Sequence, residues 1–191
     1  MRSVIGSLEA LKAHCRRALF AGGILAGLLT ADTVRTATDE QVRAAFLYQL
    51  AQYVAWPPAK SGDPLRFCVL GNDDLAELLR GMLKGKSLYN RPLTVRAVNG
   101  SDQLTACDVA FLAAGKRKQL QELLGNWSYP PVLLVGETDG FTKMGGMVNL
   151  KIDEGRVSIE INLNTARGAG LDMRSQLLRL ATIVSDGQGK P

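Results

Sequence analysis

The sequence is poor in the side chains that most enzymes use for catalysis. It contains one histidine, His14, and three cysteines. Residues 32–191 contain no histidine, which excludes from this part of the chain Ser/His and Cys/His nucleophiles, histidine acid–base catalysis and most zinc sites. Neither of the two common glycine-rich phosphate-binding motifs occurs, which weighs against a nucleotide-binding enzyme. The composition therefore favours a binding or regulatory protein over an enzyme.

The first 31 residues have the pattern of an export signal. Lys12, Arg16 and Arg17 precede an uncharged apolar segment at residues 18–29. A segment of this length is too short to cross a bilayer comfortably, since a membrane-spanning helix takes about 20 residues. We therefore predict export to the periplasm, with cleavage near Ala31. An uncleaved membrane anchor is the alternative.

The net charge does not indicate a nucleic-acid partner. The whole chain carries a formal charge of +5, and residues 1–31 hold four basic residues and one acidic residue, so their removal leaves +2. The longest remaining basic run is residues 116–118, with no aromatic side chains interleaved. A run of this kind is typical of a solvated helix start, and we expect no nucleic acid to be bound.

Two cysteines remain outside the predicted signal, Cys68 and Cys107. In an exported chain such a pair usually forms a structural disulfide, and the C-x-x-C spacing of redox enzymes is absent. The two residues fall on the first and third predicted strands, which are neighbours in the common 2-1-3-4 strand order. We predict a Cys68–Cys107 disulfide.

The most apolar stretch, residues 42–58, predicts a buried helix around which the domain is organised. Thr38 and Gln41 have the spacing of a capping box, and Trp56 followed by two prolines marks the end of the helix. The helical spacing predicts an inward face made of Val42, Ala45, Phe46, Gln49, Leu50, Tyr53 and Val54. Ala44, Leu47 and Ala51 widen this apolar face, so the helix should be buried along much of its girth. Of the large side chains here, we assign Phe46, Leu50, Tyr53 and Trp56 to the core.

The remainder alternates between strands and helices. Strands are predicted at 65–71, 93–98, 107–113 and 131–136, and helices at 73–82 and 116–124. This alternation predicts an α/β fold, Rossmann-like, with a mainly parallel sheet covered by helices on both faces. A β-hairpin at 147–161 and a final amphipathic helix at 173–184 follow, so residues 39–184 form one domain. The positions of that helix predicted to face inward are Leu177, Leu178, Leu180, Ala181 and Val184. The polar tail, 185–191, is expected to be disordered.

Three loops should meet at the carboxyl ends of the parallel strands, where such folds bind ligands: residues 71–74, 114–115 and 136–139. A small-molecule site is therefore one candidate function. Glu137 and Asp139 offer a second, as the acid and base of a hydrolase, although loop carboxylates are more often simply solvated.

The loop before the hairpin combines adjacent glycines with apolar side chains. Its candidate partner-binding residues are Phe141, Met144, Gly145, Gly146 and Met147. The alternative is that these side chains pack beneath the hairpin and only hold the fold. Asn149, Glu160 and Asn162 lie on the hairpin strands, where they either support this loop or face solvent.

Five segments together resemble a known family. They read AAFLYQLAQYVAWP at 44–57, GGMVN at 145–149, IEIN at 159–162, AGL at 169–171 and SQLLRLA at 175–181. In this order they are similar to the N- and C-terminal signatures of the YfiR-like periplasmic proteins. Gln49 and Ala55 replace the usual Asn and Glu, and the additional cysteine pair of some relatives is missing.

The resemblance implies a non-enzymatic repressor without cofactor or metal. Such proteins bind the periplasmic sensory domain of an inner-membrane diguanylate cyclase and hold it inactive, which limits cyclic-di-GMP and biofilm formation. An outer-membrane lipoprotein is a further implied partner, and a homodimer is left open. The alternatives are a periplasmic small-molecule-binding protein and a hydrolase using Glu137 and Asp139.

Overall fold

The computed structural model describes residues 37–58, 63–115, 117–153 and 156–184. The predicted signal (1–31), the predicted disordered tail (185–191) and the turn residues 154–155 lie outside the described residues.

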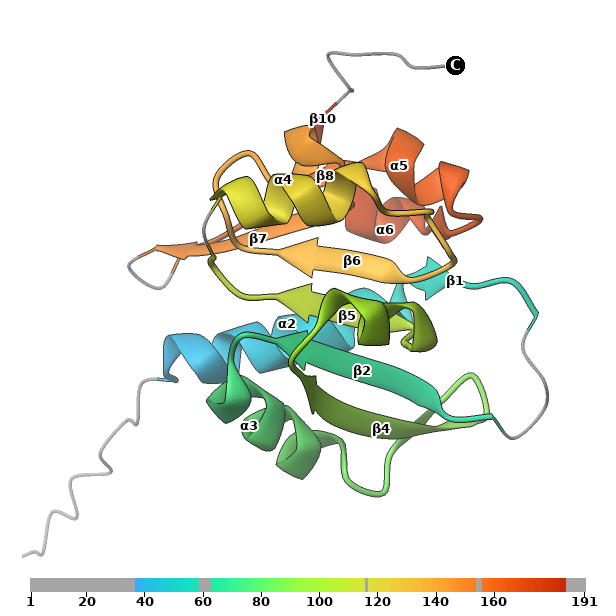
Figure 1. Cartoon of the computed structure of the whole chain (residues 1–191). Helices are drawn as coiled ribbons and strands as arrows, with labels where there is room; N and C mark the ends of the chain where they lie inside the picture. The colour runs from blue at the N-terminus through green and yellow to red at the C-terminus, as the bar shows by residue number, and fades with distance from the viewer. Residues whose placement is uncertain (1–36, 59–62, 116, 154–155, 185–191) are drawn as a thin grey trace, which may run out of the picture. The chain divides into compact units, whose positions relative to one another are not determined.

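A mainly parallel sheet forms the centre of the domain (Figure 1). Its described strands run in the order β10-β8-β7-β6-β5-β2-β4-β3. The five strands from β4 to β7 are parallel, whereas β8 pairs antiparallel with β7 and β3 antiparallel with β4. The strands are β2 (Leu65–Leu70), β3 (Ser87–Leu88), β4 (Arg91–Val98), β5 (Val109–Leu112), β6 (Leu133–Gly136), β7 (Val148–Asp153), β8 (Arg156–Asn162) and β10 (Thr182–Val184).

Helices cover both faces of this sheet. In Figure 1, α2 and α3 lie on one face, and α4 and the 3₁₀ helix η1 lie on the other. A two-stranded antiparallel sheet joins β1 (Val54–Ala55) to β9 (Asp172–Met173). The helices are α2 (Asp39–Gln52), α3 (Asp73–Leu83), η1 (Ser101–Ala106), α4 (Arg117–Gly125), η2 (Thr142–Met144), α5 (Leu163–Gly168) and α6 (Ser175–Leu178).

This architecture confirms the predicted fold class and hairpin. The four predicted parallel strands correspond to β2, β4, β5 and β6, and they occur in the expected 2-1-3-4 order. The buried runs Leu65–Leu70 and Val109–Leu112 pair directly, with Phe67 opposite Val109. Strands covered on both faces are apolar throughout, which is why these runs were visible in the sequence.

The organising helix begins as predicted and buries part of its predicted apolar surface. The capping box is present, because the backbone N–H of Gln41 donates to Thr38 Oγ1 and the N–H of Thr38 donates to Gln41 Oε1. The helix ends at Gln52 instead of continuing toward the prolines. Its buried residues are Leu50 of the predicted face and the three residues expected to widen that face, Ala44, Leu47 and Ala51. Ala45 and Gln49, also predicted to face inward, are exposed.

The larger side chains of this segment are less buried than predicted. Ala44, Leu47 and Ala51 are 0% exposed, whereas the aromatic residues lie at the edge of the core. Leu50 is 1% exposed and confirms its assignment to the core. Phe46, Tyr53 and Trp56 are only partly buried, although they pack against the core cluster. The indole N–H of Trp56 donates a hydrogen bond to the backbone oxygen of Asp108, with 3.2 Å between Nε1 and the oxygen.

The predicted helix at 173–184 is wrong. The segment divides into β9, the four-residue α6, and the edge strand β10, which pairs parallel with β8. Leu180, predicted to face inward, is 76% exposed. A short apolar run with β-branched Thr182, Ile183 and Val184 is ambiguous in sequence, and the free edge of β8 decides it in favour of a strand.

The Cys68–Cys107 disulfide is present, with 6.0 Å between the Cα atoms. Cys68 is in β2. Cys107 directly follows η1, and a single residue, Asp108, separates it from β5. The bond thus ties η1 to the centre of the sheet and closes a sequence separation of 39 residues.

Replacing both cysteines with alanine should lower the free energy of unfolding by about 3–4 kcal/mol, because the unfolded chain without the cross-link gains conformational freedom. Urea unfolding of the exported protein checks this, and wild-type protein unfolded with a reductant present should match the variant. Thiol titration of denatured wild-type protein should find no free thiol. Two thiols per exported chain, or unchanged urea midpoints, would contradict the prediction.

Candidate functional site

The three predicted loops do meet at the carboxyl edge of the sheet, and α2 joins them. The backbone N–H of Ala114 donates to Glu137 Oε1 at 2.8 Å, which links the loops after β5 and β6. Glu137 also pairs with Arg43 of α2 at 2.9 Å, and Arg43 pairs with Glu40 at 2.8 Å. Asn72, after β2, donates to Glu40 Oε1 at 3.2 Å. This network fixes the ends of three strands against the start of α2.

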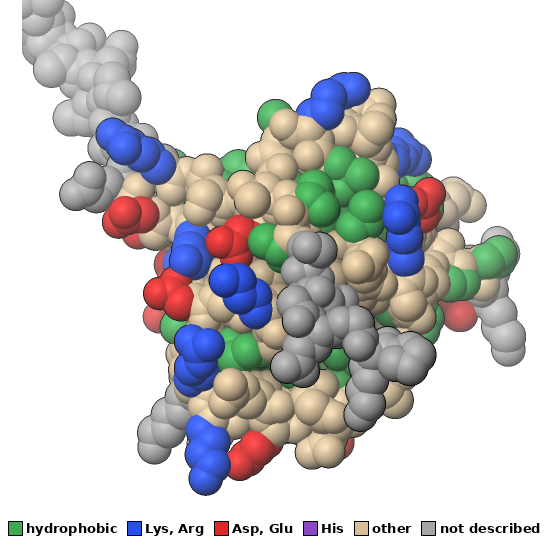
Figure 2. All heavy atoms as spheres, turned by 90° about the horizontal axis from the view of Figure 1, so that it is seen from above, with side chains coloured by type: hydrophobic (Ala, Val, Ile, Leu, Met, Phe, Trp, Pro, Cys, Tyr) green, Lys and Arg blue, Asp and Glu red, His purple; other side chains and the backbone are tan. Residues whose placement is uncertain are grey.

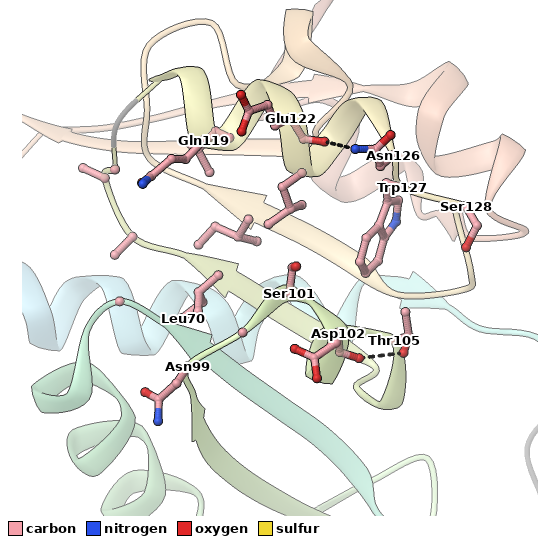
Figure 3. A pocket seen from close by; sticks show the side chains of 18 residues that line it. Leu70, Asn99, Ser101, Asp102, Thr105, Gln119, Glu122, Asn126, Trp127 and Ser128 are labelled. Carbon is pink, nitrogen blue, oxygen red and sulfur yellow. Dashed lines mark hydrogen bonds between the residues drawn. The ribbon is translucent and has the colours of Figure 1, made fainter.

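A pocket of about 820 Å³ opens beside these strand ends, on the face covered by η1 and α4 (Figure 3). We call it the strand-end pocket. Its volume lies within the range of small-molecule sites, roughly 300–1,000 Å³. It is located where the chain leaves β2 for one side of the sheet and β5 for the other, the position at which folds of this kind bind ligands.

The pocket has an apolar interior and polar walls. Leu70 and Leu112, the last residues of β2 and β5, line it together with Leu120 and Leu123 of α4. The α4 wall adds Gln119, Glu122 and Asn126, and the η1 wall adds Ser101, Asp102 and Thr105. Trp127, which follows α4, completes the lining: its ring reaches from the connection after α4 toward η1 (Figure 3).

The two carboxylates considered for hydrolysis are held in separate ion pairs. Glu137 pairs with Arg43, while Asp139 pairs with Lys151. The hydrogen bond from Lys151 lowers the pKa of Asp139 from its usual value, and the same contact raises the pKa of Lys151. Asp139 is therefore kept ionised, which is the opposite of what a general acid requires.

The loop predicted to contact a partner is largely buried. Phe141 and Met147 are both 0% exposed, and Gly146 is also buried, while Met144 and Gly145 are half-buried. The Phe141 ring lies against Gly136 and Gly146. The structure thus places Phe141, Gly146 and Met147 beneath the hairpin, as the alternative interpretation expected, because an apolar ring gains more from burial than from an exposed loop.

The polar residues of the hairpin support this same loop. Thr142 Oγ1 and Asn149 Nδ2 both donate to Glu160 Oε2 at 3.4 Å, and Asn162 Nδ2 donates to the backbone oxygen of Thr142 at 3.1 Å. Thr142, Asn149 and Asn162 are at most 1% exposed. The signature segments GGMVN and IEIN therefore supply a buried polar cluster that fixes η2 on the sheet.

A second buried polar network lies at the amino ends of β2, β4 and β5. Arg91 pairs with Asp108 at 2.6 Å, with side-chain exposures of 11% and 15%. Arg91 also donates to the backbone oxygens of Asp63 and Pro64, and Asp108 Oδ2 accepts the N–H of Arg66 at 2.8 Å. The ion pair and its hydrogen bonds thus connect the amino ends of β2, β4 and β5 to one another.

Figure 2 shows the face seen from above in Figure 1. Basic side chains on this face are scattered and interleaved with acidic ones, unlike a nucleic-acid footprint. The large apolar side chains exposed among the described residues are Tyr89, Leu180 and Ile183. In the described part of the chain, no helix is long and apolar enough to cross a membrane, and no cluster of three potential metal-binding side chains occurs.

Sequence reasoning located the strand-end loops but missed the walls of the pocket. The residues it did not single out are Asp102, Glu122 and Trp127. One usable signal was present: an isolated tryptophan follows Gly125-Asn126 at the end of α4, outside any periodic apolar pattern. No spacing rule relates that residue to η1, since the two are brought together only by the packing of the connections around β5.

Comparisons with known proteins agree with the motifs. A family model described as YfiR/HmsC-like matches residues 40–182. A solved structure, described as a conserved domain protein from Vibrio cholerae O1 biovar El Tor, is similar in fold, with a TM-score of 0.50 and 14% sequence identity. The match covers 78% of this chain and 60% of that protein. Over nearly the whole described domain, then, this chain belongs to the YfiR/HmsC-like family.

Proposed function

We propose that this protein is a non-enzymatic periplasmic regulator that binds the periplasmic sensory domain of an inner-membrane diguanylate cyclase and holds the cyclase inactive. The observation that supports this proposal is the family match over residues 40–182, together with signature segments at both ends of the domain. Loss of the regulator would then raise cyclic-di-GMP and biofilm formation. Sequestration by an outer-membrane lipoprotein would have the same effect.

The geometry is consistent with a binding protein. The carboxylates at the strand ends serve to hold loops in place, since Glu137 joins Arg43 to the Ala114 backbone and Asp139 joins Lys151. The buried cluster of Asn149, Glu160 and Asn162 likewise holds η2. The motif residues thus build the fold, and a surface held in one conformation loses less conformational entropy when it binds a partner.

Deleting the gene tests the proposal. Cyclic-di-GMP extracted from the deletion strain should rise, and expression of the full chain should restore the wild-type level. Co-purification with the periplasmic domain of the cyclase encoded in the same genome should give a stoichiometric complex. Unchanged cyclic-di-GMP in the deletion strain would contradict the proposal.

A variant without the predicted export signal tests whether the protein must leave the cytoplasm to act. The chain without residues 1–31 keeps the whole family domain but loses the predicted export signal. We expect it to accumulate in the cell without restoring the cyclic-di-GMP level. Full restoration by this variant would place the regulator's site of action on the cytoplasmic side.

A further inference from the structure

We propose that the strand-end pocket binds a small organic cation, a protonated amine on an apolar body. Its described lining combines an apolar interior, acidic side chains on both walls, and the ring of Trp127. This inference does not rest on the proposed regulatory function, because it concerns only what the isolated protein binds.

The apolar part of the ligand is accommodated by the strand ends. Leu70, Leu112, Leu120 and Leu123 supply the apolar surface, and the connections beside them are made of the smallest residues. These are Gly71, Gly100, Ala113, Ala114 and Gly115. Without bulky side chains at the strand ends, a ring or short aliphatic chain can approach the backbone, and removing its apolar surface from water favours binding.

The charge of the ligand follows from the walls. The charged side chains among the described lining residues are Asp102 on η1 and Glu122 on α4. In Figure 3 they extend from the two sides of the pocket. Two carboxylates repel a phosphate or carboxylate ligand and attract an ammonium group, so the pocket discriminates against nucleotides and organic acids.

Trp127 adds an aromatic surface to the lining. Its side chain is 8% exposed, and its ring lies between the end of α4 and η1 (Figure 3). The face of an indole ring attracts an ammonium group, so the ring favours a cationic ligand as the two carboxylates do. The same ring also gives the pocket a spectroscopic reporter.

The test uses three probes that differ only in the charge of one end: tyramine, tyrosol and 4-hydroxyphenylacetate. The protein has two tryptophans. A ¹H–¹⁵N spectrum of the exported protein therefore shows two indole N–H signals, assigned with Trp127→Phe. Trp56 already donates to the Asp108 backbone oxygen, so its signal serves as an internal control.

We expect tyramine to shift the Trp127 signal saturably, with a dissociation constant on the order of 1 mM for so small a ligand. Tyrosol should bind several-fold more weakly, and 4-hydroxyphenylacetate should cause no shift. The Trp56 signal should stay in place with all three. No saturable shift with tyramine, or an equal shift with the carboxylate probe, would overturn the proposal.

Charge-neutral variants test the role of the walls. Asp102→Asn and Glu122→Gln alter exposed side chains and should leave the melting temperature unchanged. Each should weaken tyramine binding by about two- to fivefold, the range of a solvent-accessible ion pair, and leave tyrosol binding unaltered. Asp172→Asn, an exposed acid that does not line the pocket, is the matched control. Wild-type tyramine affinity in the Asp102→Asn, Glu122→Gln double variant would also overturn the proposal.

Discussion

Asp108→Ala should lower the free energy of unfolding by about 3–5 kcal/mol, one of the two largest effects expected in this protein. The substitution leaves the guanidinium of Arg91 buried without its carboxylate, since the two side chains are only 11% and 15% exposed. It also removes the acceptor of the Arg66 backbone N–H, at 2.8 Å. The carboxylate that connects the amino ends of β2 and β4 to β5 is then missing.

A double-mutant cycle measures the pairing itself. Arg91→Met should destabilise strongly as well, whereas Arg91→Met combined with Asp108→Leu should recover much of the loss, because apolar residues of similar size can replace a buried ion pair. Urea unfolding gives all three values, and Asp172→Ala, at an exposed site, provides the control. If Asp108→Ala costs less than about 1 kcal/mol, the pair is screened by solvent and the network is unimportant for stability.

Local signals in the sequence were reliable where one interaction decides the structure. The capping box of Thr38 and Gln41 is confirmed because it involves only four consecutive residues. The Cys68–Cys107 bond is confirmed because the strand order brings β2 and β5 together and two cysteines leave one pairing. Continuous apolar runs such as Leu65–Leu70 identified the buried strands for the same reason.

Signals failed where two packings compete. The apolar residues of α2 cover much of its girth, and the sequence did not show that Ala44, Leu47 and Ala51 would be buried more completely than Phe46 and Tyr53. The C-terminal apolar run was compatible with a helix until β8 offered a free edge to β10. Neither outcome can be read from spacing alone, since each depends on a neighbour far along the chain.

The candidate site, too, was only partly predictable from the sequence. The strand-end rule located the loops at Gly71 and Ala114, which are one border of the pocket. The opposite border depends on where η1 comes to lie after β4 and where Trp127 comes to lie after α4, and on which way their side chains point. The sequence therefore indicated where a ligand could bind but not which chemistry would recognise it.

Phe141→Ala should lower the free energy of unfolding by about 3–5 kcal/mol, the second of the large effects. The ring is 0% exposed, and its removal leaves a cavity between η2 and the sheet. Thermal or urea unfolding measures the loss, and the amount of exported protein should fall with it. Any rise in cyclic-di-GMP in cells should then follow the protein level. A variant that keeps its melting temperature while cyclic-di-GMP rises would instead show Phe141 to be a partner contact.

Gly146→Ala tests the same packing from the other side of the ring. A Cβ atom at Gly146 would overlap the Phe141 ring, and one at Gly136 would lie 2.6 Å from Phe141 Cδ2. Gly146→Ala alone should therefore destabilise by about 1–3 kcal/mol through overpacking. In the Phe141→Ala background the added methyl group occupies the vacated space, so the same substitution should cost much less or stabilise. Additive effects of the two substitutions would mean that the ring and the glycine do not share one packed space, contrary to the structure.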